Sequence, residues 1–98
     1  MKQLVFSRIS DFDIKDAVDY YNWKQAGLGD RFFENMMSKI DHININPNTY
    51  SIRYENVRLA KINNFPFTIH FIDELEVIVI VGILHTSRNP QIWKQRKQ

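Results

Sequence analysis

The sequence predicts an α+β domain in which an N-terminal strand and an antiparallel helix hairpin precede an antiparallel β-meander. Apolar residues recur at helical spacing in two stretches between residues 10 and 46, and three short apolar stretches follow residue 56. The last of these, Val77–Leu84, is rich in β-branched side chains and is typical of a central strand buried on both faces. A chain of 98 residues suits one hydrophobic core, so we expect residues 1–98 to form a single domain.

The first strand is expected at Lys2–Ser7, and the first helix directly follows it. Ser10 is a suitable N-cap, because a serine side chain can accept a hydrogen bond from a free N–H group of the first turn. The helix then carries one apolar stripe at positions i, i+3, i+4 and i+7, formed by Ile14, Ala17, Val18 and Tyr21. Gly27 and Gly29 end this helix.

The second helix is expected to begin near Asp30 and to stop by Asn46, because Pro47 cannot continue it. Its apolar stripe consists of Phe33, Met36, Met37 and Ile40. The connection to the first helix is short and contains glycine, which predicts an antiparallel hairpin. Residues 47–56 form a polar, turn-rich connection to the strands.

Three strands follow, at Val57–Ile62, Phe65–Ile72 and Val77–Leu84. The connections Asn63–Asn64 and Asp73–Glu74 are short, so the three strands should form an antiparallel meander. The middle strand has an alternating apolar face that we expect to pack against the helix hairpin, formed by Phe65, Phe67, Ile69 and Phe71.

Composition excludes several classes of function. The chain has no cysteine, so disulfides, thiolate nucleophiles and cysteine-based zinc sites are excluded. Its three histidines are far apart in sequence, and we expect neither a metal site nor a cofactor. No apolar run is long enough to span a membrane, and the N-terminus does not resemble a signal peptide, so we expect a cytoplasmic protein.

The net charge of +2 is low, but charge is unevenly distributed along the chain. The region from residue 11 to residue 19 is acidic, and no acidic residue follows Glu76. The last eleven residues carry the basic side chains of Arg88, Lys94, Arg96 and Lys97. Such a tail suits phosphates or an acidic protein partner, and it is equally typical of a solvated C-terminus.

Four stretches carry a resemblance to a known family: Asp13–Phe33, Asn46–Tyr50, Val57–Phe71 and Ile83–Trp93. Together with the element order, they resemble the RelE/ParE superfamily of toxins from bacterial type II toxin–antitoxin modules. The resemblance implies a helix hairpin on one side of an antiparallel sheet, and an antitoxin that wraps a segment over the toxin. Two activities occur in this superfamily. RelE-like members cleave mRNA on the ribosome, whereas ParE-like members poison DNA gyrase.

RNA cleavage requires side chains that move protons and side chains that hold positive charge against the phosphate. The resemblance implies that Arg58 and Arg88 match arginines of RelE-like members, and His85 can supply acid–base chemistry near neutral pH. We expect these three to lie close together on the sheet. Arg58 could instead form an ion pair, and His85 a structural hydrogen bond. Further candidates for phosphate or target contacts are Arg53, Lys61, Trp93, Lys94 and Arg96.

Our leading hypothesis is a ParE-like toxin that inhibits DNA gyrase and replication by binding protein. The net charge is low and the tail is basic. Trp93 stands where RelE-like nucleases have a tyrosine, and an indole cannot exchange a proton as a tyrosine hydroxyl can. Candidates for antitoxin contact in a hetero-oligomer are Tyr20, Tyr21 and Trp23. The alternatives are a RelE-like ribosome-dependent mRNA endonuclease, which would make the chain an enzyme, and a non-toxic binding member of an autoregulated complex.

Overall fold

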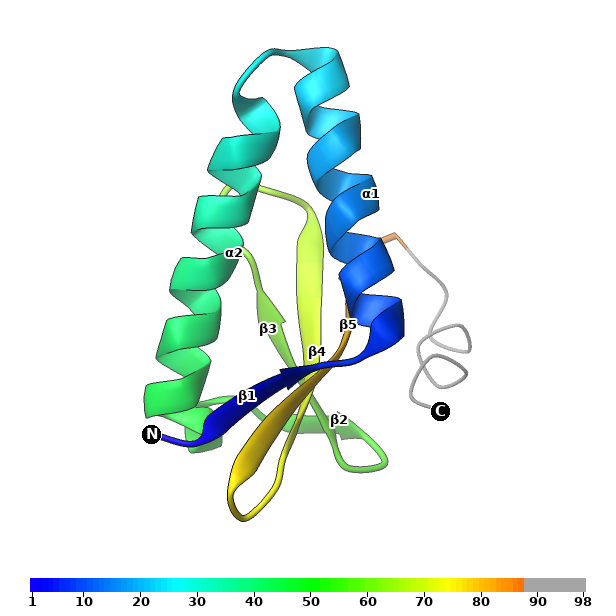
Figure 1. The fold of residues 1–98 in the computed structure, drawn as a ribbon. Coiled ribbons are helices and arrows are strands. Elements are labelled where there is room, and N and C mark those ends of the chain that lie inside the picture. Colours follow the sequence, from blue (N-terminus) through cyan, green and yellow to red (C-terminus); the bar gives the residue numbers. More distant parts are fainter. Residues whose placement is uncertain (88–98) are drawn as a thin grey trace.

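The structure, a computed structural model, describes residues 1–87 (Figure 1). Its elements are β1 (Gln3–Phe6), α1 (Arg8–Lys24), α2 (Leu28–Ile45), the 3-10 helix Pro47–Thr49, β2 (Ile52–Tyr54), β3 (Val57–Lys61), β4 (Phe67–Asp73) and β5 (Val77–His85). The predicted α+β class and the order of strand, helix hairpin and meander are confirmed. The candidates Arg88, Trp93, Lys94 and Arg96 lie outside the described residues.

The five strands form one sheet in the order β1-β5-β4-β3-β2, and both helices lie on the same side of it (Figure 1). Strands β3, β4 and β5 pair antiparallel, as predicted, and β2 pairs antiparallel with β3. Strand β1 pairs parallel with β5, which places β5 inside the sheet. The middle of the five strands is β4, so β5 is an interior strand next to the middle one.

The predicted apolar face of β4 is confirmed, and a bulge in β5 turns two of its residues to the same side of the sheet. Ile69 and Phe71 are fully buried toward the helices. Phe71 pairs with Ile80 and the preceding residue pairs with Gly82, so Val81 is an extra residue in β5. This bulge shifts the alternation by one position. As a result, Ile80 and Ile83 both face the helices although they are three residues apart.

Strand β4 begins at Phe67, two residues later than predicted. The N–H group of Phe67 donates to the carbonyl oxygen of Phe65 at 2.8 Å, which makes a tight turn around Pro66. Phe65 therefore lies outside the sheet pairing, but its ring is still buried in the core. An alternating apolar pattern therefore does not show where a strand begins, because a residue in the preceding turn can also point into the core.

The first helix starts earlier than predicted, because Ser7 rather than Ser10 is its N-cap. The hydroxyl oxygen of Ser7 accepts the N–H of Ser10 at 3.0 Å, and the carbonyl of Ser7 accepts the N–H of Asp11 at 3.1 Å. Ser10 is buried in the first turn, where its own hydroxyl donates back to the Ser7 carbonyl at 2.7 Å. Serine is a favoured N-cap at either position, so the sequence does not distinguish the two. The position of Ser7 in the tertiary structure determines that it is the N-cap.

The two glycines of the helix connection have different roles. Gly27 has a positive φ of 86° and caps α2, which begins at Leu28 rather than near Asp30. Gly29 lies inside the first turn of α2, where its N–H donates to the Asn22 side-chain oxygen at 2.8 Å. A Cβ atom at Gly29 would collide with the carbonyl oxygen of Val18 on α1. The absence of a side chain at Gly29 therefore allows the two helices to approach closely.

The core between the helices and the sheet is rich in aromatic rings. Tyr21 of α1 lies 5.5 Å from Phe32 and 4.9 Å from Phe65, measured between ring centroids. Phe32 in turn lies 5.2 Å from Phe67. The predicted stripe of α2 needs correction at one position, because Phe32 is fully buried while Phe33 is 44% exposed.

The polar connection before the meander contains a short edge strand that was not predicted. Strand β2 pairs with β3 through Ile52 opposite Arg58 and Tyr54 opposite Val57, and Glu55 turns the chain with a positive φ of 47°. The alternation of Ile52 and Tyr54 was the available signal. Three residues are too few for that signal to be decisive, because a strand this short depends on its neighbour.

The burial of Phe71 predicts a large loss of stability in Phe71→Ala. Truncating a buried phenylalanine typically removes about 3–5 kcal/mol from the free energy of unfolding. The matched control is Phe33→Ala, which should cost about 1 kcal/mol because much of that ring is already in water. Urea unfolding followed by circular dichroism measures both values. Similar losses in the two variants would mean that the helix-facing side of β4 is assigned wrongly.

The close helix approach predicts that Gly27 and Gly29 respond differently to substitution. Gly29→Ala should cost about 1–3 kcal/mol by overpacking, and Gly29→Asn should be worse. Gly27→Ala should cost about 1–2 kcal/mol through its left-handed backbone, and Gly27→Asn should cost less, because asparagine tolerates that conformation. Thermal melts of the four variants test this ranking. If Asn is better than Ala at both positions, steric contact at Gly29 is not the reason for its glycine.

Candidate functional site

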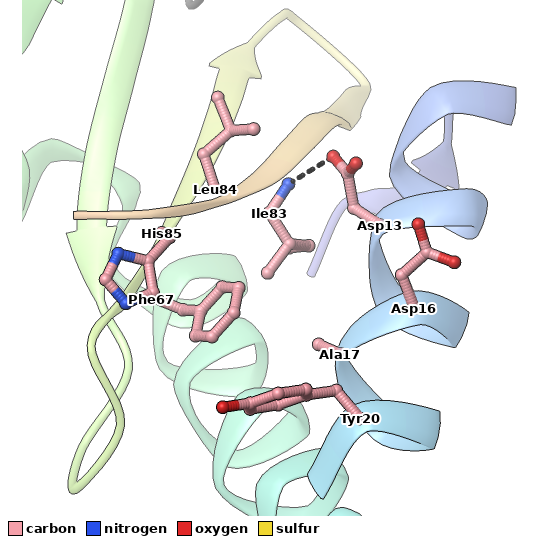
Figure 2. A pocket seen from close by; sticks show the side chains of 8 residues that line it. All are labelled: Asp13, Asp16, Ala17, Tyr20, Phe67, Ile83, Leu84 and His85. Atoms are coloured by element: carbon pink, nitrogen blue, oxygen red, sulfur yellow. Dashed lines mark hydrogen bonds between the residues drawn. The ribbon is translucent and has the colours of Figure 1, made fainter. Parts of the chain in front are cut away.

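A cleft of about 170 Å³ lies between α1 and the C-terminal end of β5 (Figure 2). It is lined by Asp13, Asp16, Ala17, Tyr20, Phe67, Ile83, Leu84 and His85. Helix α1 supplies one wall, and the ends of β4 and β5 supply the other. In the part of the chain that the structure describes, this cleft brings together titratable and aromatic side chains from elements far apart in sequence.

The spacing of the two walls is set by hydrogen bonds between α1 and the edge of β5. Strand β1 ends at Phe6, opposite Ile80, and the polar groups of β5 beyond this point need other partners. The N–H of Ser7 donates to the Ile80 carbonyl at 3.0 Å, and the N–H of Ile83 donates to the Asp13 carboxylate at 3.0 Å. These two hydrogen bonds join the start of α1 to β5 beside the cleft.

Phe67, the first residue of β4, is one of three rings that line the cleft. Phe67 packs edge to face against His85, with 5.3 Å between the ring centroids. Figure 2 shows Tyr20 and His85 on either side of the Phe67 ring, with the Tyr20 hydroxyl directed to the side on which His85 lies. Ala17 leaves room between these rings, because its side chain is a single methyl group.

His85 is held by the turn that follows it. Its Nδ1 atom lies 3.1 Å from the backbone nitrogen of Ser87 and 2.8 Å from the Ser87 hydroxyl oxygen. The predicted structural hydrogen bond at this strand end is therefore present. His85 is half-buried, whereas Ser87 is exposed.

One side of α1 carries a row of exposed side chains, three of them aromatic, and the two in its middle line the cleft. Phe12, Asp16, Tyr20 and Trp23, here called the α1 stripe, follow one another at spacings of four, four and three residues and so share one side of the helix. Trp23 is 80% exposed, and its ring lies 6.4 Å from that of Tyr20. Exposed aromatic side chains beside an apolar cleft are typical of a protein-binding surface.

The three predicted antitoxin contacts divide between surface and core. Tyr20 and Trp23 are both exposed, and Tyr20 lines the cleft. Tyr21 points into the aromatic core instead, and its burial raises the pKa of its hydroxyl above the usual value. Phe12, Asp16 and Phe67 were not among the predicted contact residues. The helical spacing of Phe12 and Asp16 with Tyr20 was visible in the sequence, but nothing there placed Phe67 opposite them.

The structure does not bring Arg58 and His85 together, so that expectation was wrong. Arg58 pairs with Phe71 and His85 pairs with Phe67, a separation of four residues along β4. At about 3.3 Å per residue this is roughly 13 Å along the strand, before the width of the intervening strand is added. The Arg58 guanidinium donates to the Tyr50 carbonyl at 2.6 Å, at the other end of the sheet.

The other basic candidates also lie away from the cleft. Arg53 is exposed on the edge strand β2. Lys61 ends β3, where its ammonium group donates to the carbonyls of Ile62 at 3.2 Å and Phe65 at 2.9 Å. Within residues 1–87, no group of three acidic or histidine side chains is placed to hold a metal ion. No helix in the same residues is long and apolar enough to cross a membrane.

The remaining two histidines lie elsewhere. His42 is exposed on α2, and its Nδ1 atom is 2.6 Å from the Tyr50 hydroxyl oxygen. His70 is buried on the sheet face opposite the helices, with its Nδ1 atom 3.1 Å from the Tyr54 hydroxyl oxygen. Burial lowers the pKa of His70 to about 4 and raises the pKa of Tyr54 to about 12, so both are neutral at pH 7.

The helix hairpin on one face of the sheet is the arrangement that the resemblance to the RelE/ParE superfamily implied. A family model described as the ParE toxin of the type II toxin–antitoxin system parDE matches residues 4–90. Because this match spans most of the sequence, the chain belongs to the ParE toxin family and is a toxin component of the type II class.

A solved structure has the same fold. It is a chain of the chromosomal ParDE toxin–antitoxin system from P. aeruginosa, similar to this chain with a TM-score of 0.75 and 18% sequence identity. The alignment covers 87% of this chain and 96% of that chain. A comparison with curated protein sequences found no match.

The buried His70 predicts that stability falls as the pH is lowered from about 6.5 toward 4. The unfolded chain binds a proton at this histidine with the ordinary pKa of 6.5, whereas the folded chain does not until about pH 4. Each pH unit in this window removes up to about 1.4 kcal/mol, so the loss between pH 6.5 and 5 is about 2 kcal/mol.

Urea unfolding at several pH values measures this loss, and His70→Gln provides the comparison. The variant should lose about 2 kcal/mol less than the wild type over the same interval, whatever its stability at neutral pH. Parallel pH profiles for the two proteins would show that His70 does not titrate abnormally.

Proposed function

We propose that this protein is a cytoplasmic toxin that inhibits DNA gyrase by protein binding and is neutralised by a cognate antitoxin seated on the α1–β5 cleft. The observation that carries the proposal is the cleft itself, with the α1 stripe along its border. Membership in the ParE family supports the target, and the ParDE assembly of the similar solved structure supports the partner.

The chemistry of the cleft fits a protein segment better than a small molecule or a nucleic acid. Its floor is apolar, its exposed border is aromatic, and the charged side chains that line it, Asp13 and Asp16, are acidic. Acidic side chains repel the phosphates of DNA and RNA. A protein segment can instead place an aliphatic side chain over Phe67 and a basic one near Asp16, with the exposed rings packing around it.

Two observations support binding rather than RNA cleavage as the toxic activity. Arg58 is far from His85 along the sheet and is engaged with the Tyr50 carbonyl. The Nδ1 atom of His85 accepts the N–H of Ser87, so its lone pair is already engaged in the turn. Cleavage through the 2′-hydroxyl needs positive charge and a proton acceptor at the same phosphate.

The test is an induction experiment in bacteria, with and without the short acidic reading frame expected beside the toxin gene. Induction alone should arrest growth, and trapped gyrase–DNA complexes should accumulate before translation falls. Coexpression of the antitoxin should restore growth. Trp23→Glu should remain toxic but escape neutralisation, because it places a charge in the α1 stripe.

The matched control is Leu75→Glu, since Leu75 is 91% exposed in the β4–β5 turn, outside the cleft. This variant should be toxic and fully neutralised. Codon-phased mRNA cuts without gyrase complexes would replace the proposal by the RelE-like endonuclease. If Trp23→Glu is neutralised as completely as Leu75→Glu, the antitoxin does not contact the α1 stripe. The absence of any growth arrest would indicate a non-toxic binding member.

A further inference from the structure

His85 is the one histidine of the described residues that lines the cleft, and its orientation is fixed from two sides. Phe67 packs against one side of the imidazole ring, and the turn after β5 places Ser87 against its Nδ1 atom. A ring held at an aromatic contact and at a hydrogen bond has little freedom to flip. The two ring nitrogens therefore have separate roles.

The contact with Ser87 determines which nitrogen carries the proton. A backbone N–H can only donate, so the Ser87 N–H at 3.1 Å requires an unprotonated Nδ1 in the neutral ring. The Ser87 hydroxyl, at 2.8 Å from the same atom, adds a second donor. The proton of neutral His85 then resides on Nε2, which becomes a hydrogen-bond donor.

The polar groups of the cleft have complementary roles. The Asp13 carboxylate accepts the backbone N–H of Ile83 and so joins α1 to β5. Asp16 is exposed and presents an acceptor at the rim. His85 lines the cleft and presents its Nε2–H as a donor, because its Nδ1 atom is the acceptor of the Ser87 N–H. A bound segment therefore meets one fixed donor beside the Phe67 ring.

We propose that His85 is a specificity-determining residue that donates its Nε2–H to an oxygen acceptor of the antitoxin, and that Ser87 is the positioning residue that keeps the proton there. The antitoxin segment would carry a carbonyl, carboxamide or carboxylate oxygen opposite His85, an aliphatic side chain over Phe67 and a basic side chain opposite Asp16. The antitoxin part rests on the proposed function. The tautomer of His85 does not, because it is a property of the isolated toxin.

The tautomer is tested first, by long-range proton–nitrogen NMR of the isolated toxin at a pH where the imidazole is neutral. We expect His85 to give the signature of a protonated Nε2 and an unprotonated Nδ1. Ser87→Ala keeps the backbone N–H and should keep this signature, whereas Ser87→Pro removes both donors and should give a mixture of tautomers. A mixture in the wild type, or an unchanged signature in Ser87→Pro, would overturn the role of Ser87.

The donor is tested by calorimetry with the purified antitoxin and two variants that both remove the aromatic ring. A glutamine amide nitrogen occupies about the position of histidine Nε2, whereas an asparagine amide reaches only the Nδ1 position. His85→Asn should weaken binding about ten- to a hundredfold, which corresponds to an acceptor left unpaired on burial. His85→Gln should recover at least about threefold of that loss.

Equal losses in the two variants would overturn the donor role, and both at wild-type affinity would place His85 outside the interface. Failure of the proposed function gives a different result. In that case the wild-type toxin does not bind the antitoxin at all, while the NMR signature of His85 stays as expected. Thermal melts of the variants show whether any loss reflects unfolding, because an unfolded variant has no cooperative transition.

Discussion

The arrangement of this molecule depends on how the edge of β5 is completed. Strand β1 covers this edge only as far as Ile80, yet the strand continues to His85 and is buried for most of its length. Buried backbone groups without partners are costly, so the remaining edge needs hydrogen bonds from elsewhere. Ser7 and Asp13 provide them from the start of α1. The helix is therefore attached to the strand by polar contacts and not only by its apolar stripe.

This attachment gives α1 three separate sides. One side packs into the aromatic core through Tyr21, a second faces α2, where Gly29 lets the two helices meet, and the third runs along the open edge of the sheet. The third side cannot close fully on β5, because the side chain of Asp13 spans the distance between helix and strand. The cleft is the consequence, and the α1 stripe remains exposed beside it.

The same geometry supports the proposed binding role over RNA cleavage. Cleavage of RNA needs positive charge and a proton carrier at the same phosphate. The Nδ1 atom of His85 accepts the N–H of Ser87, and Arg58 donates to the Tyr50 carbonyl at the opposite end of the sheet. A fixed donor, an acidic rim and exposed rings are what recognition of a protein segment requires. These features support the proposal that the toxin acts through contact with protein partners.

The sequence alone was sufficient for features that depend on local periodicity. The helix hairpin, the meander and the buried pair Ile69 and Phe71 follow from the spacing of apolar residues along the chain. This spacing is 3.6 residues in a helix and 2 in a strand, whatever packs against the element. Other features depend on residues far apart in sequence. Ser7 rather than Ser10 caps α1 because its N–H reaches Ile80, and the bulge at Val81 is visible only in the pairing with β4. Only the tertiary structure could bring Phe67, His85 and Tyr20 together in one cleft. Their positions in the sequence do not reveal that α1 packs along the open edge of β5.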